Sequence, residues 1–188
     1  MNNVIDFNQY KKRVLKFESL LEDKQYDLNR LKKILNIAII SSFLVNEVKR
    51  EIFYDKSDPD KFEQLENSLL KLITSKDKTN IVSLKEYSNL RVLHGVLGLN
   101  TESTETLEAQ LKAINTKNLD MTNLREELGD IFWYLAVIQD ELKLDLNETL
   151  DINAKKLELR FKNKAFSKEN AFNRDISSEH KVLEFKKK

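Results

Sequence analysis

Glycine and proline are almost missing from this chain, whose 188 residues include three glycines and one proline. Tight turns between strands usually need these two residues, because they supply the required backbone conformations. Their scarcity predicts an almost entirely helical, all-α protein. A chain of this length can bury a core of its own. Its 34% charged and 40% hydrophobic residues are typical of a folded protein and not of a disordered one.

The charge balance and the missing residue types exclude several classes of protein. A net charge of +1 gives no overall field that would favour nucleic acid or a membrane surface. The absence of cysteine excludes disulfides and thiolate metal sites, and it fits a reducing cytoplasm. The first residues lack the basic start and apolar run of a signal peptide, and the apolar stretch 34–45 is too short to span a bilayer. We therefore expect a cytoplasmic protein that binds neither nucleic acid nor a membrane.

Apolar residues recur at helical spacing through most of the chain. The pattern predicts helices over about 6–28, 29–54, 59–73, 82–113, 122–143 and 146–161. Asp58 and Pro59 suit the N-cap and first position of the third helix, and Asp145 with Glu148 suits a capping box. Gly95 and Gly98 mark either a helix break or a close helix crossing, because glycine is unfavourable inside a helix.

Two short acidic motifs, Glu102-Ser-Thr-Glu105 and Glu126-Glu127-Leu-Gly-Asp130, carry the chemistry. The pairs Glu102/Glu105 and Glu127/Asp130 have i,i+3 spacing, which places both carboxylates of a pair on one helix face. Two such helices packed together would surround one point with four carboxylates, which repel one another unless a cation lies among them. Hard oxygen ligands of this kind suit Mg²⁺, with Mn²⁺ as a second choice. A single glutamate would be better interpreted as a solvated acid, but two spaced pairs beside an apolar stripe favour a metal site.

The order of motifs between residues 90 and 175 resembles a known family. The family is the all-α nucleoside triphosphate pyrophosphohydrolases, the MazG-like group that includes the dimeric all-α dUTPases and the phosphoribosyl-ATP pyrophosphohydrolases. Residues 93–99 with Glu102 and Glu105 resemble the first metal helix of the family. Residues 126–130 with Trp-Tyr-Leu-Ala at 133–136 resemble the second. The family's substrate-side elements resemble Asn153-x-x-Lys156-Leu-x-x-Arg160-Phe and the later Asn-Arg174-Asp.

The resemblance implies a fold and an assembly. It implies an all-α helical bundle with a four-helix catalytic core in residues 81–175. Residues 1–80 do not match the minimal family domain and are predicted to form extra N-terminal helices, and residues 176–188 are predicted to form a polar tail. The resemblance also implies a homodimer or homotetramer. A weak parallel between residues 35–54 and the Glu102 helix indicates either a degenerate half-repeat in the N-terminal segment or chance similarity between two amphipathic helices.

The resemblance also implies an activity, which is Mg²⁺-dependent cleavage of a nucleoside triphosphate, or a related nucleotide, to the monophosphate and pyrophosphate. The expected metal ligands are Glu102, Glu105, Glu127 and Asp130, and the expected catalytic residues are Glu126 and Glu127. Glu126 is a ligand, a neighbour of the ligands or the group that orients the attacking water. The expected substrate-binding residues are Asn153, Lys156, Arg160, Arg174, Trp133 and Tyr134.

Several of these residues also have simpler interpretations. Lys156 and Arg160 would form an ordinary solvated basic face on a helix, and Trp133 and Tyr134 would pack in a core. The chain departs from the family pattern at Thr101, where many relatives carry a further glutamate. A non-catalytic helical binding module is therefore the alternative function. A di-iron carboxylate bundle is excluded, because the chain has no Glu-x-x-His pair.

Overall fold

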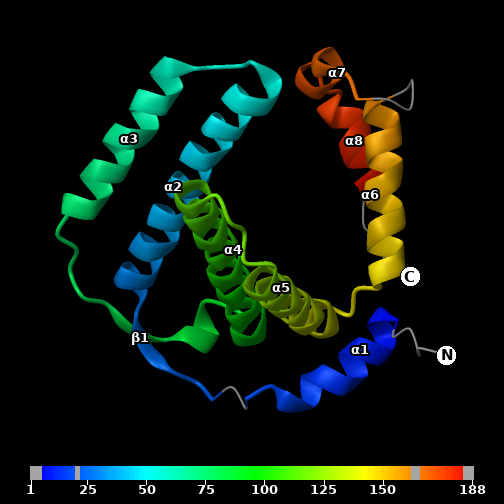
Figure 1. Cartoon of the computed structure of the whole chain (residues 1–188). Coiled ribbons are helices and arrows are strands. Elements are labelled where there is room, and N and C mark those ends of the chain that lie inside the picture. Colours follow the sequence, from blue (N-terminus) through cyan, green and yellow to red (C-terminus); the bar gives the residue numbers. More distant parts are fainter. Residues whose placement is uncertain (1–5, 20–21, 162–165, 184–188) are drawn as a thin grey trace. The chain divides into compact units, whose positions relative to one another are not determined.

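The computed structural model describes residues 6–19, 22–161 and 166–183, and the chain divides into two compact units. The first unit comprises Met1–Glu22 and Ser88–Lys188, and the second comprises Asp23–Tyr87. More than three quarters of the described residues are helical, which confirms the all-α prediction (Figure 1). The exceptions in regular structure are two short antiparallel strands, β1 (Gln25–Asp27) and β2 (Ile81–Ser83). None of the described helices combines the length and the apolar character that crossing a membrane requires.

The second unit is a helical hairpin closed at its base by the strand pair. Helix α2 (Leu28–Tyr54) packs along α3 (Pro59–Thr74). Asp58 caps α3 by accepting a hydrogen bond from the Lys61 backbone N–H at 3.1 Å, with Pro59 at the first helical position, as predicted. Asp27 caps α2 and also accepts from the Asn80 backbone N–H at 3.0 Å. One carboxylate thus fixes the start of α2 against the chain that leads into β2.

The first predicted helix, over 6–28, is wrong in its second part. Helix α1 (Phe7–Val14) continues only as a 3₁₀ turn over Leu15–Phe17, and the chain is extended at Gln25–Asp27. An N-cap residue needs a non-helical backbone, so the capping role of Asp27 ends any helix before α2 begins. The predicted helix 82–113 likewise starts later, as α4 (Leu90–Thr116), because β2 pairs with β1.

The first unit is centred on the helices α4 and α5 (Met121–Leu142), which lie side by side (Figure 1). Helix α4 is continuous, so Gly95 and Gly98 mark a close crossing and not a break. A Cβ atom at Gly95 would lie 2.5 Å from Ile138 Cγ1, and one at Gly98 would lie 2.0 Å from Tyr134 Cε1. The two glycines therefore let α5 side chains rest directly on the α4 backbone.

The N-terminal segment is fastened to this helix pair through Arg91. Its guanidinium donates to Glu18 (2.7–3.1 Å), Asp140 (2.7 Å) and Glu141 (3.3 Å). Trp133 Nε1 donates to the Val14 carbonyl oxygen at 3.4 Å. These contacts explain why α1 belongs to the first unit although the whole second unit separates it from α4 in sequence.

The remaining helices of the first unit are α6 (Leu146–Arg160), α7 (Lys168–Phe172) and α8 (Ile176–Leu183). Asp145 caps α6 by accepting from the Glu148 backbone N–H at 2.9 Å, as predicted. Helix α8 packs on α6. Residues 176–183, expected from the sequence to be a polar tail, are thus helical, and residues 184–188 lie outside the described residues.

Candidate metal centre and arginine cluster

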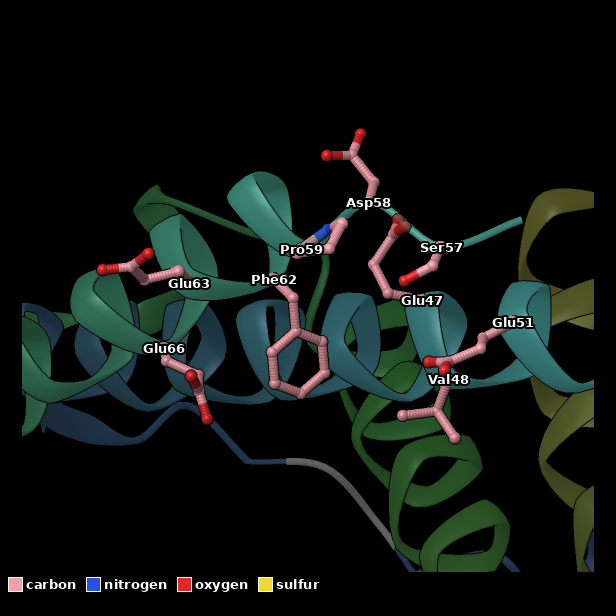
Figure 2. A pocket seen from close by; sticks show the side chains of 9 residues that line it. All are labelled: Glu47, Val48, Glu51, Ser57, Asp58, Pro59, Phe62, Glu63 and Glu66. Atoms are coloured by element: carbon pink, nitrogen blue, oxygen red, sulfur yellow. The ribbon is translucent and has the colours of Figure 1, made fainter. Parts of the chain in front are cut away.

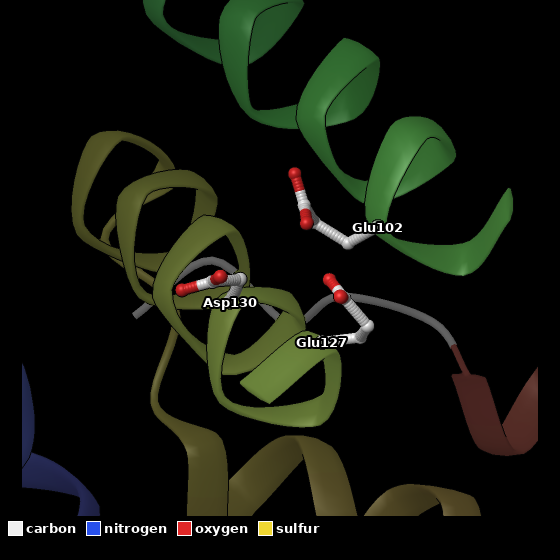
Figure 3. A group of neighbouring side chains, drawn as sticks. All are labelled: Glu102, Glu127 and Asp130. Carbon is white, nitrogen blue, oxygen red and sulfur yellow. The ribbon is translucent and has the colours of Figure 1, made fainter. Parts of the chain in front are cut away.

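Three of the predicted acidic residues come together between α4 and α5. Glu102 on α4 and Glu127 and Asp130 on α5 each place a carboxylate oxygen within 4.8 Å of the other two (Figure 3). Glu127 is only 4% exposed, Glu102 is partly buried and Asp130 is exposed. The group is therefore anchored in the helix interface on one side and open on the other, as a ligand-binding site requires.

The capped start of α5 positions the buried carboxylate. Asp120 caps the helix by accepting from the backbone N–H groups of Thr122 and Asn123. One turn later, Asn123 Nδ2 donates to Glu127 Oε1 at 2.6 Å. On α4, the Thr101 hydroxyl donates to the Gly98 carbonyl oxygen (2.8 Å) and lies 3.2 Å from Glu102 Oε1. Both inner carboxylates thus have a polar neighbour that restricts their orientation.

Mutual repulsion perturbs the acids of this cluster. Burial raises the pKa of Glu102, and the charges of Asp130 and Glu127 raise it further. The charges of Glu127 and Glu102 raise the pKa of Glu105, so Glu105 lies in the field of the cluster although it is not one of the three converging groups. Converging hard oxygen atoms whose charges repel one another are a donor set that fits a divalent cation of the Mg²⁺ type.

Aromatic side chains border the acidic cluster. The ring of Tyr134 rests on Gly98, and burial together with the charges of Glu102, Asp130 and Glu105 raises its pKa. Trp133 packs edge-on against Tyr134, with 4.7 Å between ring centroids, and is bonded to the N-terminal segment. Of the two predicted aromatic residues, Trp133 and Tyr134, it is Tyr134 whose pKa the acids raise.

Sequence reasoning missed two residues near the acids. Asn123 precedes Glu127 by four residues, so helical spacing alone places it on the same face and would have identified it. Tyr10 on α1 donates its hydroxyl to the Gly129 carbonyl oxygen at 3.3 Å. Burial and the charge of Asp130 raise the pKa of Tyr10. No local pattern links Tyr10 to a residue 119 positions away, so only the fold reveals it.

The predicted phosphate contacts Arg160 and Arg174 lie together at the α6–α8 packing. Both donate to the carboxylate of Glu179, which is 2% exposed. The two guanidinium groups lower the pKa of Glu179 to about 2. These residues border a pocket of about 150 Å³, whose lining also includes the amide side chains of Asn170 and Asn173.

The other predicted site residues lie on helix surfaces. Glu126 is exposed on α5, next to the buried Glu127. On α6, Asn153 is exposed and Lys156 is partly buried. Helical spacing of three and four residues places Asn153, Lys156 and Arg160 along one face of α6.

A second, acidic pocket of about 500 Å³ lies between α2 and α3 in the second unit (Figure 2). Its wall includes Glu47, which is 4% exposed and whose Oε1 accepts hydrogen bonds from Lys61 Nζ and Arg50 Nη1. Its Oε2 is buried and has no hydrogen-bond partner among the described residues. The side chains of Val48 and Phe62 contribute apolar surface. Here a protein ammonium group already neutralises the buried carboxylate.

Comparison with known proteins bears on the first unit. The sequence model of the MazG nucleotide pyrophosphohydrolase domain matches residues 96–165. This range contains Glu102, Glu127, Asp130 and Arg160, and it ends before Arg174 and Glu179. No curated protein and no solved structure matches the chain. The segment 96–165 is thus similar to the nucleotide pyrophosphohydrolase domain of the MazG-like superfamily.

Proposed function

We propose that this protein is a Mg²⁺-dependent nucleotide pyrophosphohydrolase, which cleaves a nucleoside triphosphate or a related nucleotide to the monophosphate and pyrophosphate. The observation that carries the proposal is the convergence of Glu102, Glu127 and Asp130 inside the segment that matches the MazG domain. Ordinary nucleotides, aberrant nucleotides and alarmones are all candidate substrates.

The carboxylates would hold the cation, with Glu102 from one helix and Glu127 and Asp130 from the other. Glu105 completes the proposed ligand set, and the raised pKa values of Glu102 and Glu105 support it, because an added positive charge would relieve the repulsion that raises them. A bound Mg²⁺ supplies neutralisation of phosphate charge and lowers the pKa of a bound water. Mn²⁺ has the same ligand preference and is expected to substitute for it.

The neighbours of these ligands have supporting roles in the proposal. Asn123 holds the buried Glu127 in one orientation through its 2.6 Å hydrogen bond. Glu126 is exposed beside it, and we assign to it the orientation of the attacking water and acceptance of its proton. Tyr134 borders the acids and would line the nucleotide pocket, whereas Trp133 contacts the N-terminal segment.

Basic and amide side chains at α6–α8 would bind the rest of the substrate. Arg160 and Arg174 present guanidinium groups, which match phosphate oxygens in geometry and charge. Lys156 lies on the same face of α6 as Arg160 and would add a further positive charge. Asn153 would donate to the base or the sugar.

We further propose assembly as a homodimer or homotetramer through α4 and α5. Large apolar side chains with i,i+4 and i,i+3 spacing are exposed on α4, namely Leu107, Leu111 and Ile114. Leu128 and Phe132 are about half exposed on α5. An apolar face of this kind is typical of an interface. Sedimentation should show a dimer or larger species that Leu111→Lys converts to smaller ones, and a wild-type monomer at working concentration would contradict the proposal.

The first experiment measures pyrophosphate and monophosphate release from a panel of NTPs and dNTPs, with Mg²⁺ and with EDTA. Wild type is compared with Glu127→Gln, which keeps the shape of the buried side chain but removes its charge. Glu108→Gln is the matched control, because it neutralises an exposed carboxylate on α4 outside the converging group.

The expected result is Mg²⁺-dependent release that is lost in Glu127→Gln and retained in Glu108→Gln. The same variants should differ in Mg²⁺ binding by calorimetry. No release from any nucleotide together with no Mg²⁺ binding would refute the enzyme proposal. That outcome would favour a helical binding module.

A further inference from the structure

The carboxylate of Glu179 lies between the two arginines assigned to phosphate binding, and it lies outside both acidic motifs and outside residues 96–165. We propose that Glu179 is a positioning residue, which holds Arg160 and Arg174 in one fixed arrangement so that together they bind a phosphate group of the substrate. This inference rests on the proposed function, and it assigns the phosphate-binding part of that site to the α6–α8 packing.

The geometry is a double fork. Arg160 donates from Nε and Nη2 to the two oxygens of Glu179 at 2.9 and 2.7 Å. Arg174 donates from the same pair of atoms at 3.3 and 2.5 Å. Each guanidinium therefore uses one edge on Glu179, and neither Nη1 atom donates to a described residue. The free edges remain available to phosphate oxygens, which accept hydrogen bonds from guanidinium groups in the same forked way.

Charge explains why a carboxylate is needed at this point. Two guanidinium groups repel each other, so they come together only where a negative charge lies between them. Glu179 supplies one negative charge to the two guanidinium groups, which keep their outer edges for a ligand. The other acid at the pocket, Asp175, accepts hydrogen bonds from the backbone N–H and hydroxyl of Ser178 (3.0 and 2.6 Å).

Burial and access differ along the cluster in the way that a binding site requires. Glu179 is 2% exposed, and the Arg160 side chain is largely covered, whereas the Arg174 side chain is 43% exposed. The carboxylate therefore forms the back of the cluster and Arg174 reaches solvent. The adjoining pocket of about 150 Å³ holds the volume of about five water molecules, which is room for a phosphate group but not for a whole nucleotide. Asn170 and Asn173 add neutral donors at its edge.

A purely structural role for Glu179 predicts different behaviour. If the carboxylate only ties α8 to α6, its loss would lower thermal stability and leave anion binding by the folded protein unchanged. If it positions the arginines, its loss would weaken anion binding by the folded protein. Binding and stability must therefore be measured separately.

The test titrates inorganic pyrophosphate into the full-length protein by calorimetry in metal-free buffer, so that neither hydrolysis nor the acidic cluster contributes. Glu179→Gln removes the charge and keeps the shape, and Glu179→Asp keeps the charge but is one methylene too short to reach both forks. Glu158→Gln is the control, because it neutralises an exposed acid on α6 two residues before Arg160. Circular dichroism and thermal melts establish that each variant is folded.

We expect both Glu179 variants to weaken pyrophosphate binding by about tenfold or more, since forked charge-assisted hydrogen bonds are lost. The control should stay within about twofold of wild type. In an Arg174→Lys background, which lacks one fork, Glu179→Gln should have a much smaller effect, because the two residues act together. In turnover, Glu179→Gln should raise KM and leave kcat nearly unchanged, because Glu179 does not touch reacting atoms.

Unchanged pyrophosphate affinity in a folded Glu179 variant would overturn the inference, as would a wild type that does not bind pyrophosphate at millimolar concentration. If neither Glu179 variant folds, Arg174→Lys takes their place in the titration: weakened binding supports the fork, and unchanged binding refutes it. Failure of the proposed function is distinguishable, because it appears as absent nucleotide hydrolysis while the metal-free titration still separates Glu179→Gln from Glu158→Gln.

Discussion

The crossing of α4 and α5 at Gly98 should be sensitive to a single methyl group. A Cβ atom added there would lie 2.0, 2.1 and 2.3 Å from three ring carbons of Tyr134. Because non-bonded carbons pack no closer than about 3.5 Å, the ring or the helix must move by about 1.5 Å. Glu102 lies one turn along the same helix, so a wedge at this point also separates the acids on α4 from those on α5.

The size of the effect follows from two opposing contributions. Overpacking of this kind costs about 3 kcal/mol, at the upper end of the usual range, while replacing glycine by alanine inside a helix returns about 1 kcal/mol. Gly98→Ala should therefore lower the free energy of unfolding by about 2 kcal/mol, which corresponds to a fall in Tm of about 4–8 °C for a chain of this size. Its affinity for Mg²⁺ should fall as well.

Gly129 provides the matched control, because a Cβ atom there meets nothing within 4 Å. Gly129→Ala should raise the free energy of unfolding by about 0.5–1 kcal/mol through helix propensity alone. Thermal melts in EDTA and calorimetric Mg²⁺ titrations of both variants are the measurements. Equal Tm values for Gly98→Ala and Gly129→Ala would refute the close crossing that positions the metal ligands.

Three further perturbations test other parts of the first unit. The pKa of Glu105 is raised, so its negative charge destabilises the metal-free fold once the pH rises above that pKa. Glu105→Gln should therefore raise Tm in EDTA at about pH 7.5 and have little effect near pH 4. A gain in Tm that does not depend on pH would contradict this. Arg91→Ala should lower the free energy of unfolding by about 2 kcal/mol, and with it the midpoint of urea unfolding, because Glu18 and Asp140 lose their shared partner. An unchanged midpoint would mean that other contacts hold the N-terminal segment. Lys143 has a left-handed backbone (φ 54°), so Lys143→Gly should raise the free energy of unfolding by about 0.5–1 kcal/mol in thermal melts, and a loss of stability would contradict that.

The acids could be located from sequence because they depend on helix geometry alone. Spacing placed Glu127 and Asp130 on one face, and the structure brings Glu102 to them from α4. The apolar stripe of α5 was less well predicted. Ala136 and Val137 are fully buried, while Leu128, which has the predicted apolar spacing, is 46% exposed. The glycines of α4 admit the side chains of Tyr134 and Ile138, so the close contact with α4 involves the second half of α5. Periodicity identifies a face but not how closely a neighbour approaches it.

Contacts between residues far apart in the sequence could not be predicted either, because periodicity describes one helix at a time. The pairing of β1 with β2 joins segments more than 50 residues apart, and the bond from Tyr10 to Gly129 spans 119. Neither has a local signature. Arg160 and Arg174 could be named from the motif order, but their shared carboxylate lies in a segment that composition alone presents as a polar tail. The burial of Glu179 in a short, polar helix can be recognised only from the positions of its two arginine partners.

Glu47 in the α2–α3 pair and Glu127 in the α4–α5 pair are both buried, and their charges are balanced from different sources. Glu47 forms an ion pair with Lys61 on the neighbouring helix, so a residue of the second unit itself balances the charge of Glu47. Glu127 has an amide from Asn123 and, under the proposed function, a cation drawn from solution. The free divalent-cation concentration would then tune the rigidity of one unit and not of the other. Hydrogen exchange with and without a chelator should display this as a difference between α5 and α2 within a single chain.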